Sequence, residues 1–140
     1  MKKNNAPPLS YIDYAKELIR EESDGLILLA KELRDDFSKV VKLVINCSGN
    51  IIITGIGKSG LIGQKIASTI SSTGIPAFFI HPSEANHGDM GKLSKNDLVI
   101  ILSKSGESKE FFNIIEYCHQ LGITMVAITA KIKSVWASGK

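Results

Sequence analysis

The first third of the chain repeats apolar and polar residues with the period of a helix. Ser10, followed three residues later by Asp13, is typical of a helix start. Apolar residues then recur at helical spacing over residues 11–18 and over residues 26–44. Ser23 or Asp24 can cap the second segment, so we expect two amino-terminal helices. The longer stripe can pack on a sheet or on a neighbouring subunit, and the sequence leaves both open.

From Asn50 onward the pattern changes to short apolar runs typical of buried strands. These runs cover residues 51–53, 77–80, 97–102 and 124–129. Helical patterns over residues 61–73 and 110–121 lie between them, each followed by a glycine. Residues 81–96 indicate a polar loop or a broken helix. The order predicts parallel βαβ units with right-handed crossovers, in a doubly wound, flavodoxin-like α/β sandwich.

Composition narrows the class of protein. The 140 residues fit one domain, for which we expect residues 10–140 after a flexible amino terminus over residues 1–9. The net charge of +3 is spread along the chain, which argues against a nucleic-acid partner. No apolar run approaches the length that spans a membrane, and residues 1–9 do not resemble a signal peptide. Cys47 and Cys118 form no CxxC pair, which favours a reducing cytoplasm.

The turn after the first strand has a composition suited to an anion. It reads T-G-I-G-K-S-G over residues 54–60, and its backbone glycines are Gly55, Gly57 and Gly60. Glycines let backbone N–H groups approach an anion at the amino end of the following helix. Lys58 and Ser59 then fit a small phosphorylated ligand, although a tight turn with an exposed lysine is the alternative.

Two nucleotide-binding motifs fit this turn less well. A dinucleotide site needs an acidic residue at the end of the next strand, and here that strand ends Phe79, Ile80, His81. A Walker A loop also needs a glycine upstream of its G-K pair, at a position that falls here in the apolar run Ile51–Ile53. We therefore expect neither a nucleotide nor any other cofactor.

Two further polar segments follow the second and third strands. Residues 103–108 read S-K-S-G-E-S, and Ser103, Ser105 and Ser108, with a turn at Gly106, can ligate a phosphate without a metal. Serines before a helix are otherwise caps. Residues 81–91 read H-P-S-E-A-N-H-G-D-M-G, where a histidine can move protons near neutral pH or lie exposed in a loop. Its spacing matches no trusted zinc pattern, so we expect no metal.

The strings G-I-G-K-S-G, H-P-S-E-A-N-H-G-D-M-G and S-K-S-G-E-S, in this order and spacing, resemble bacterial arabinose-5-phosphate isomerases of the sugar isomerase (SIS) family. The likeness runs from about residue 49 to residue 129. It implies interconversion of D-ribulose 5-phosphate and D-arabinose 5-phosphate through a cis-enediol, a step towards the 3-deoxy-manno-octulosonate of lipopolysaccharide or capsule. It also implies a cytoplasmic homo-oligomer, a dimer or a tetramer.

By matching position, the resemblance implies roles for seven side chains. Lys58, His87 and Glu110 correspond to active-site residues, and the phosphate ligands are Ser59, Ser103, Ser105 and Ser108. Either His87 or Glu110 can be the base, and Lys58 can stabilise the enediolate or the phosphate.

The resemblance ends after about residue 130, where family members continue through another strand and helix and most add a pair of CBS domains. We therefore expect a partial SIS domain, truncated after the fourth strand, with an open sheet edge and weak or no isomerase activity. The alternative function is a non-catalytic SIS domain that senses a sugar phosphate.

Overall fold

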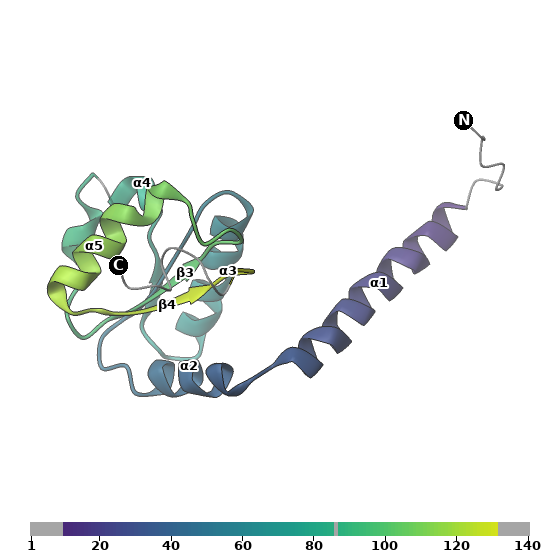
Figure 1. The fold of residues 1–140 in the computed structure, drawn as a ribbon, viewed down its shortest axis with the longest axis horizontal. Helices are drawn as coiled ribbons and strands as arrows, with labels where there is room; N and C mark the ends of the chain where they lie inside the picture. The colour runs from purple at the N-terminus through teal and green to yellow at the C-terminus, as the bar shows by residue number, and fades with distance from the viewer. Residues whose placement is uncertain (1–9, 86, 132–140) are drawn as a thin grey trace. The chain divides into compact units, whose positions relative to one another are not determined.

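The structure is a computed structural model that describes residues 10–85 and 87–131. The predicted flexible start over residues 1–9 and the end of the chain from residue 132 lie outside the described residues. The chain divides into two compact units, Met1–Lys39 and Val40–Lys140, and each is described by itself. Figure 1 traces the elements in chain order.

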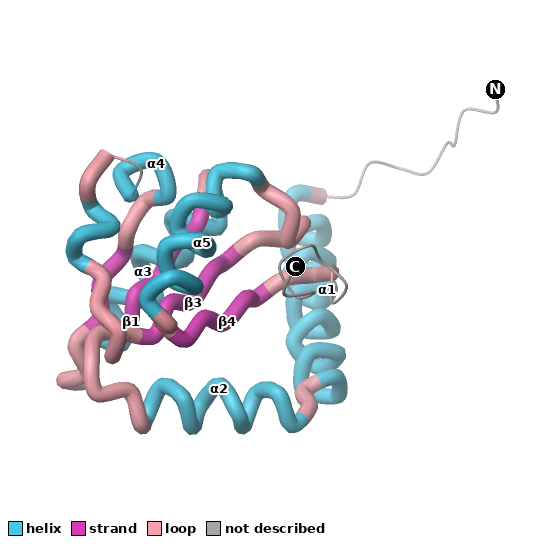
Figure 2. The backbone as a smooth tube through the Cα atoms, turned by 60° about the vertical axis from the view of Figure 1, so that its left-hand side comes forward, coloured by secondary structure: helices cyan, strands magenta, loops and turns pink. Residues whose placement is uncertain are grey.

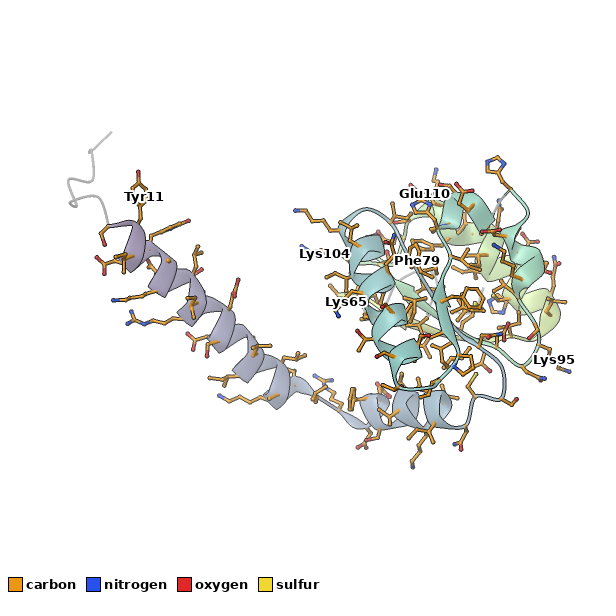
Figure 3. The ribbon with its side chains drawn as sticks, turned by 180° about the vertical axis from the view of Figure 1, so that it is seen from behind. Tyr11, Lys65, Phe79, Lys95, Lys104 and Glu110 are labelled. Carbon is orange, nitrogen blue, oxygen red and sulfur yellow. The ribbon has the colours of Figure 1, made fainter. Side chains whose placement is uncertain are left out.

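The first unit is dominated by one long helix, α1 (Tyr11–Glu32). Ser10 caps it as predicted: the Ser10 hydroxyl accepts from the backbone N–H of Asp13 at 3.2 Å and donates to its carboxylate at 2.6 Å. Every residue of α1 is exposed. Figure 3 shows their side chains, from Tyr11 onward, projecting from the helix.

The predicted helix start at Ser23 or Asp24 is wrong. Helix α1 runs through both residues, because the strong helix formers that follow them continue the hydrogen-bond ladder. The break comes at Leu33, whose backbone is extended (φ −60°, ψ 127°), and α2 (Asp35–Ile45) begins two residues later. There are two amino-terminal helices as expected, but their boundary lies about ten residues further along.

The second unit contains a parallel sheet of four strands, which confirms the predicted fold class. The strands are β1 (Ile51–Gly55), β2 (Ala77–Phe79), β3 (Leu98–Leu102) and β4 (Thr124–Ile128), in the spatial order β2-β1-β3-β4. All neighbouring pairs are parallel, with Ile53 opposite Phe79 and Ile100.

Helices cover both faces of this sheet because successive strand residues point to opposite sides. Ile51 and Ile53 pack with Ala67 of α3 (Lys58–Ser72) on one face. Ile52 packs on the other face with Phe111 of η2 (Lys109–Phe111) and with Ile114 of α5 (Phe112–Leu121). Along the chain, the short elements α4 (Pro82–Ala85) and η1 (Asp89–Lys92) follow β2 and precede β3. Figure 2 shows α3 and α5 on opposite sides of the sheet.

The strand order reverses direction between β1 and β3. The chain leaves β1 for β2 on one side and later returns to β3 on the other side of β1. In doubly wound sheets such a reversal opens a crevice outside the carboxyl ends of the two strands, where ligands bind. The crevice therefore lies where the turns after β1 and β3 meet.

A buried carboxylate fixes the opposite end of the sheet. Asp97 is 3% exposed and accepts hydrogen bonds from the backbone N–H groups of Asn50 and Ser94, both at 2.7 Å. The side-chain amide of Asn50 donates a third bond at 3.1 Å. Burial acts to raise the pKa of Asp97, but these hydrogen bonds outweigh it and hold the pKa below its usual value. The residue ties the starts of β1 and β3 together.

The edge of the sheet formed by β4 is more exposed to solvent than the central strands β1 and β3. Thr124, Ala127 and Ile128 of β4 are exposed, and β4 pairs with β3 alone among the described strands. Within the described residues, no helix combines the length and the apolar character needed to span a bilayer.

Candidate functional site

The turn after β1 is built on close backbone approaches. A Cβ atom on Gly55 would lie 2.8 Å from the carbonyl oxygen of Ser59, so the end of β1 and the first turn of α3 meet without room for a side chain. Gly57 precedes the helix with φ +56°. Because Gly57 has no side chain with which to cap the helix, the first N–H groups of α3 are open to an external anion at the carboxyl edge of the sheet.

The turn after β3 gathers three serine hydroxyls. The Ser103 hydroxyl, which is buried, accepts from the backbone N–H of Gly106 at 3.2 Å and so shapes the turn. The Ser105 hydroxyl lies 3.5 Å from that of Ser108 and accepts from the N–H of Glu107 at 3.3 Å. Both Ser105 and Ser108 are half-buried. Their hydroxyls can therefore donate to a ligand.

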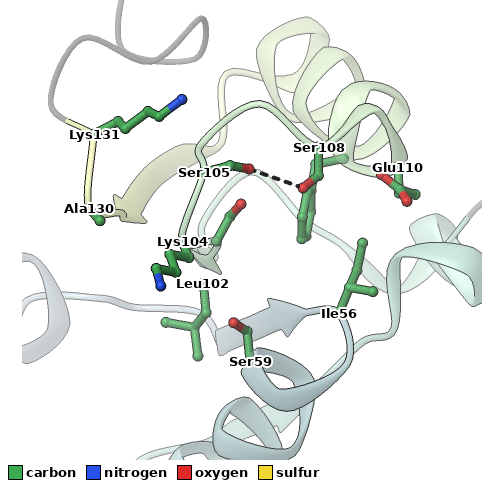
Figure 4. A pocket seen from close by; sticks show the side chains of 11 residues that line it. Ile56, Ser59, Leu102, Lys104, Ser105, Ser108, Glu110, Ala130 and Lys131 are labelled. Carbon is green, nitrogen blue, oxygen red and sulfur yellow. Dashed lines mark hydrogen bonds between the residues drawn. The ribbon is translucent and has the colours of Figure 1, made fainter. Parts of the chain in front are cut away.

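The two turns line one cavity of about 520 Å³, within the range of small-molecule sites. Ser59 contributes from the start of α3, and the three serines contribute from the turn after β3. Figure 4 shows Ser59, Ser105 and Ser108 around this cavity, with the Ser105–Ser108 contact drawn as a dashed line. The serines that the sequence analysis placed at neighbouring strand ends therefore line one cavity.

Two lysines that the sequence analysis did not single out also line the cavity. They are Lys104, inside the serine turn, and Lys131, after β4. The Lys131 ammonium pairs with the Glu107 carboxylate at 3.2 Å, while the described salt bridges do not include Lys104. The Lys104 carbonyl accepts from the N–H of Ala130 at 3.2 Å, which ties the turn to the end of β4. Lys104 was detectable in sequence by its place within S-K-S-G-E-S, whereas Lys131 had no local signal.

The three candidate proton-transfer and charge-stabilising residues occupy different places. Glu110 is exposed and lines the cavity. Lys58 lines an adjoining cavity of about 380 Å³, which shares Ser59 and Lys104 with the first. His87 is not one of the described residues that line these two cavities. It is exposed in the segment after α4.

The segment of residues 81–91 forms its own contacts. The Nδ1 atom of His81 accepts from the backbone N–H of Ser83 at 3.2 Å, and Asp89 pairs with Lys92 at 2.7 Å. Within the described chain no three histidine, cysteine or acidic side chains gather as metal ligands would.

Comparisons with known proteins agree with this geometry. The SIS domain family matches residues 44–140. The chain is 40% identical to the arabinose 5-phosphate isomerase KdsD of Pseudomonas aeruginosa over 94% of its own length, and 42% identical to KdsD of Francisella tularensis over 91%. It spans about 40% of the length of these curated relatives.

A solved structure shares both fold and sequence with the chain. It is an Escherichia coli CFT073 protein in complex with arabinose 5-phosphate, with a TM-score of 0.84 and 31% identity over 93% of this chain and 71% of that chain. The family match covers well over half of the residues and includes both turns that line the cavity. The chain therefore belongs to the SIS domain family.

Proposed function

We propose that this chain binds a pentose 5-phosphate and carries part of the active site of an isomerase that interconverts D-arabinose 5-phosphate and D-ribulose 5-phosphate, with weak or no turnover by this chain alone. The observation that carries the proposal is the cavity at the reversal between β1 and β3, where hydroxyls from two neighbouring strand ends meet. The names of the relatives support the choice of sugar, since those proteins are arabinose 5-phosphate isomerases.

The phosphate has a complementary setting in this cavity. A phosphate monoester offers oxygen acceptors and carries close to two negative charges at neutral pH. Ser59, Ser105 and Ser108 supply hydroxyl donors, and the free N–H groups at the start of α3 add to them. The Lys104 ammonium supplies the opposite charge. No metal is needed to hold the group.

The isomerisation needs a base to move a proton between C1 and C2 and a positive charge near the developing enediolate oxygen. We assign the base to Glu110, because its carboxylate lines the cavity that holds the serines. We assign the charge-stabilising role to Lys58, which lines the adjoining cavity. His87 lies outside both linings, so a role for it requires the segment after α4 to move.

Binding is tested by isothermal titration with arabinose 5-phosphate, with NAD as the contrasting ligand. Ser105→Ala removes one donor to a charged group, a loss of about 1.5–3 kcal/mol, which weakens binding about tenfold to a hundredfold. Ser72→Ala, an exposed serine at the far end of α3, is the matched control and leaves affinity unchanged. Tight binding of NAD, or no binding of the sugar phosphate, would contradict the proposal.

Catalysis is tested separately by deuterium wash-in at C2 of the bound sugar. An isomerase exchanges this proton with solvent, whereas a domain that only senses the sugar phosphate binds it without exchange. Glu110→Gln should abolish exchange and leave affinity nearly intact. Unimpaired exchange in Glu110→Gln with loss in His87→Ala would transfer the role of base to His87.

We propose further that the chain self-associates through α1, in the reducing cytoplasm that its two free cysteines suit. Residues 25–30 read G-L-I-L-L-A, so this part of the helix is apolar on every side. Helices with apolar residues all round are normally buried, yet Leu26 is 67% and Leu28 59% exposed. A second copy offers the same surface, as symmetric pairs do.

Sedimentation velocity over a range of concentrations tests this assembly. Leu29→Glu should shift the chain to monomer, while Lys31→Glu, a charge change two residues away, should leave assembly intact. A wild-type chain that stays monomeric at high concentration would refute the self-association.

A further inference from the structure

Thr54 has a hydroxyl that the rest of the chain does not use. Among the described residues, its Oγ1 is the one buried side-chain polar atom without a hydrogen-bond partner, and the residue is 0% exposed. A buried hydroxyl normally finds a partner, and leaving it unpaired destabilises the folded state. An unpaired group of this kind in a native fold calls for an explanation, such as a role in binding.

The alternation of β1 fixes the side of the sheet on which this hydroxyl lies. Ile52 packs on the α5 face and Ile53 on the α3 face, so Thr54 shares the α5 face with Ile52. The next residue on that face is Ile56, which packs against the α5-face cluster and lines the cavity. Thr54 therefore lies two residues before Ile56 on the same face of the sheet, one layer deeper than the cavity wall to which Ile56 belongs.

The register of the neighbouring strand β3 also places Thr54 one layer below the cavity. Thr54 pairs in register with Ile101 of β3, and Ser103, two residues further along the chain and just past the end of β3, lines the cavity. Phe111 also belongs to both places: it lines the cavity and packs in the core cluster with Ile52. The hydroxyl thus lies in the layer directly beneath the cavity floor, on the side covered by η2.

The chemistry of the ligand supplies what Thr54 lacks. A pentose 5-phosphate carries hydroxyl groups along its carbon chain, which can donate or accept a hydrogen bond, and in its open-chain form a carbonyl oxygen, which accepts one. The serines serve the phosphate, while much of the remaining lining, Ile56, Leu102 and Phe111, is apolar. A threonine hydroxyl both donates and accepts, so it can pair with a sugar hydroxyl in either sense.

We propose that Thr54 is a sugar-binding residue whose hydroxyl bonds to the carbon chain of the ligand when the Phe111 ring moves aside. This rests on the proposed function, because it names an inner wall of the same site. The cost of the unpaired hydroxyl in the free chain is then recovered on binding. The 3₁₀ segment η2, which is only three residues long and joins the serine turn to α5, is the element that must shift.

The isosteric variant Thr54→Val separates binding from a purely structural role. It removes the hydroxyl and keeps the shape, so the melting temperature of the free chain should rise. Its affinity for arabinose 5-phosphate should fall about fivefold to tenfold, the effect of one neutral hydrogen bond. Its affinity for inorganic phosphate, which the serines, the start of α3 and Lys104 hold without Thr54, should not change. Stability and sugar binding therefore move in opposite directions.

Two further variants complete the titration experiment. Thr54→Ser restores the hydroxyl and should recover most of the sugar-phosphate affinity. Thr124→Val removes a threonine hydroxyl from the exposed strand β4 at the opposite end of the sheet and should change neither affinity.

Each outcome has one meaning. If Thr54→Val binds arabinose 5-phosphate as tightly as the wild type, Thr54 is not a ligand and the inference fails while the proposed function stands. An equal loss of affinity for phosphate and sugar phosphate indicates a distorted turn and also refutes it. If the wild-type chain binds inorganic phosphate but no sugar phosphate, the proposed function fails as well.

Discussion

The apolar run over residues 25–30 of α1 and the two central strands β1 and β3 are both rich in apolar residues, yet they have opposite environments. Ile53 of β1 is 0% exposed, whereas Ile27 of α1 is 51% exposed. The strands are covered on both faces by α3 and α5 of their own unit. The apolar run of α1 has no such cover among the described residues. An apolar run in the sequence thus predicts a surface that other residues should cover. Only the fold shows whether those residues belong to the same unit.

The largest effect should come from the same truncation made in both regions. Ile53→Ala should lower the free energy of unfolding by about 2–5 kcal/mol, because it opens a cavity in a closed core. Ile27→Ala should change it by less than about 0.5 kcal/mol in dilute solution, because the side chain is already in water. Urea unfolding at low protein concentration measures both. Equal losses would show that α1 is packed within the single chain.

A glycine pair should give effects of opposite sign. A Cβ on Gly49 would contact the Asp97 carboxylate and lie 2.6 Å from the Asn96 carbonyl, so Gly49→Ala should cost about 1–3 kcal/mol. A Cβ on Gly25 has no neighbour within 4 Å, and alanine favours a helix by about 0.8–1.0 kcal/mol. Thermal unfolding followed by circular dichroism should show a lower midpoint for the first and higher helix stability for the second. A lower helix stability in Gly25→Ala would indicate close packing around α1.

A pair of carboxylate changes extends the comparison to pH. Asp97→Asn should cost about 1–3 kcal/mol at pH 7, because the buried carboxylate accepts three hydrogen bonds. Its folded pKa is lowered, so its contribution is complete above the unfolded value of about 4 and is lost as pH falls through the folded pKa. Urea unfolding should therefore show a smaller difference from wild type at low pH. Asp24→Asn, exposed on α1, should change stability little at either pH.

The smallest effect is expected at the start of α1. Ser10→Ala removes the cap on the Asp13 N–H and should weaken the helix by about 1 kcal/mol. Ser23→Ala, in the helix interior, should not weaken it, because the helix does not begin there. Amide hydrogen exchange in the first turn measures the loss. Faster exchange near residue 24 in Ser23→Ala would instead indicate that Ser23 caps a helix start, as the sequence analysis expected.

The site was predictable in part. Ser59 and the serine turn could be foreseen because parallel strands bring the turns after β1 and β3 to the same edge. The position of His87 outside the cavity lining could not, because it depends on how a loop without helical or strand period folds back. Lys131 was missed because no local pattern marks it. The pairing of β4 with β3 is what brings it beside Glu107.

The sequence by itself determined the order of the elements, the parallel sheet and the faces of its strands, because apolar period and turn composition are local properties that each segment carries. Only the tertiary structure decided where the first helix breaks, which charged groups surround the cavity, and that the Thr54 hydroxyl has no partner among the described residues. These features depend on which distant residues come into contact, and that is set by the packing of the whole unit rather than by any segment alone.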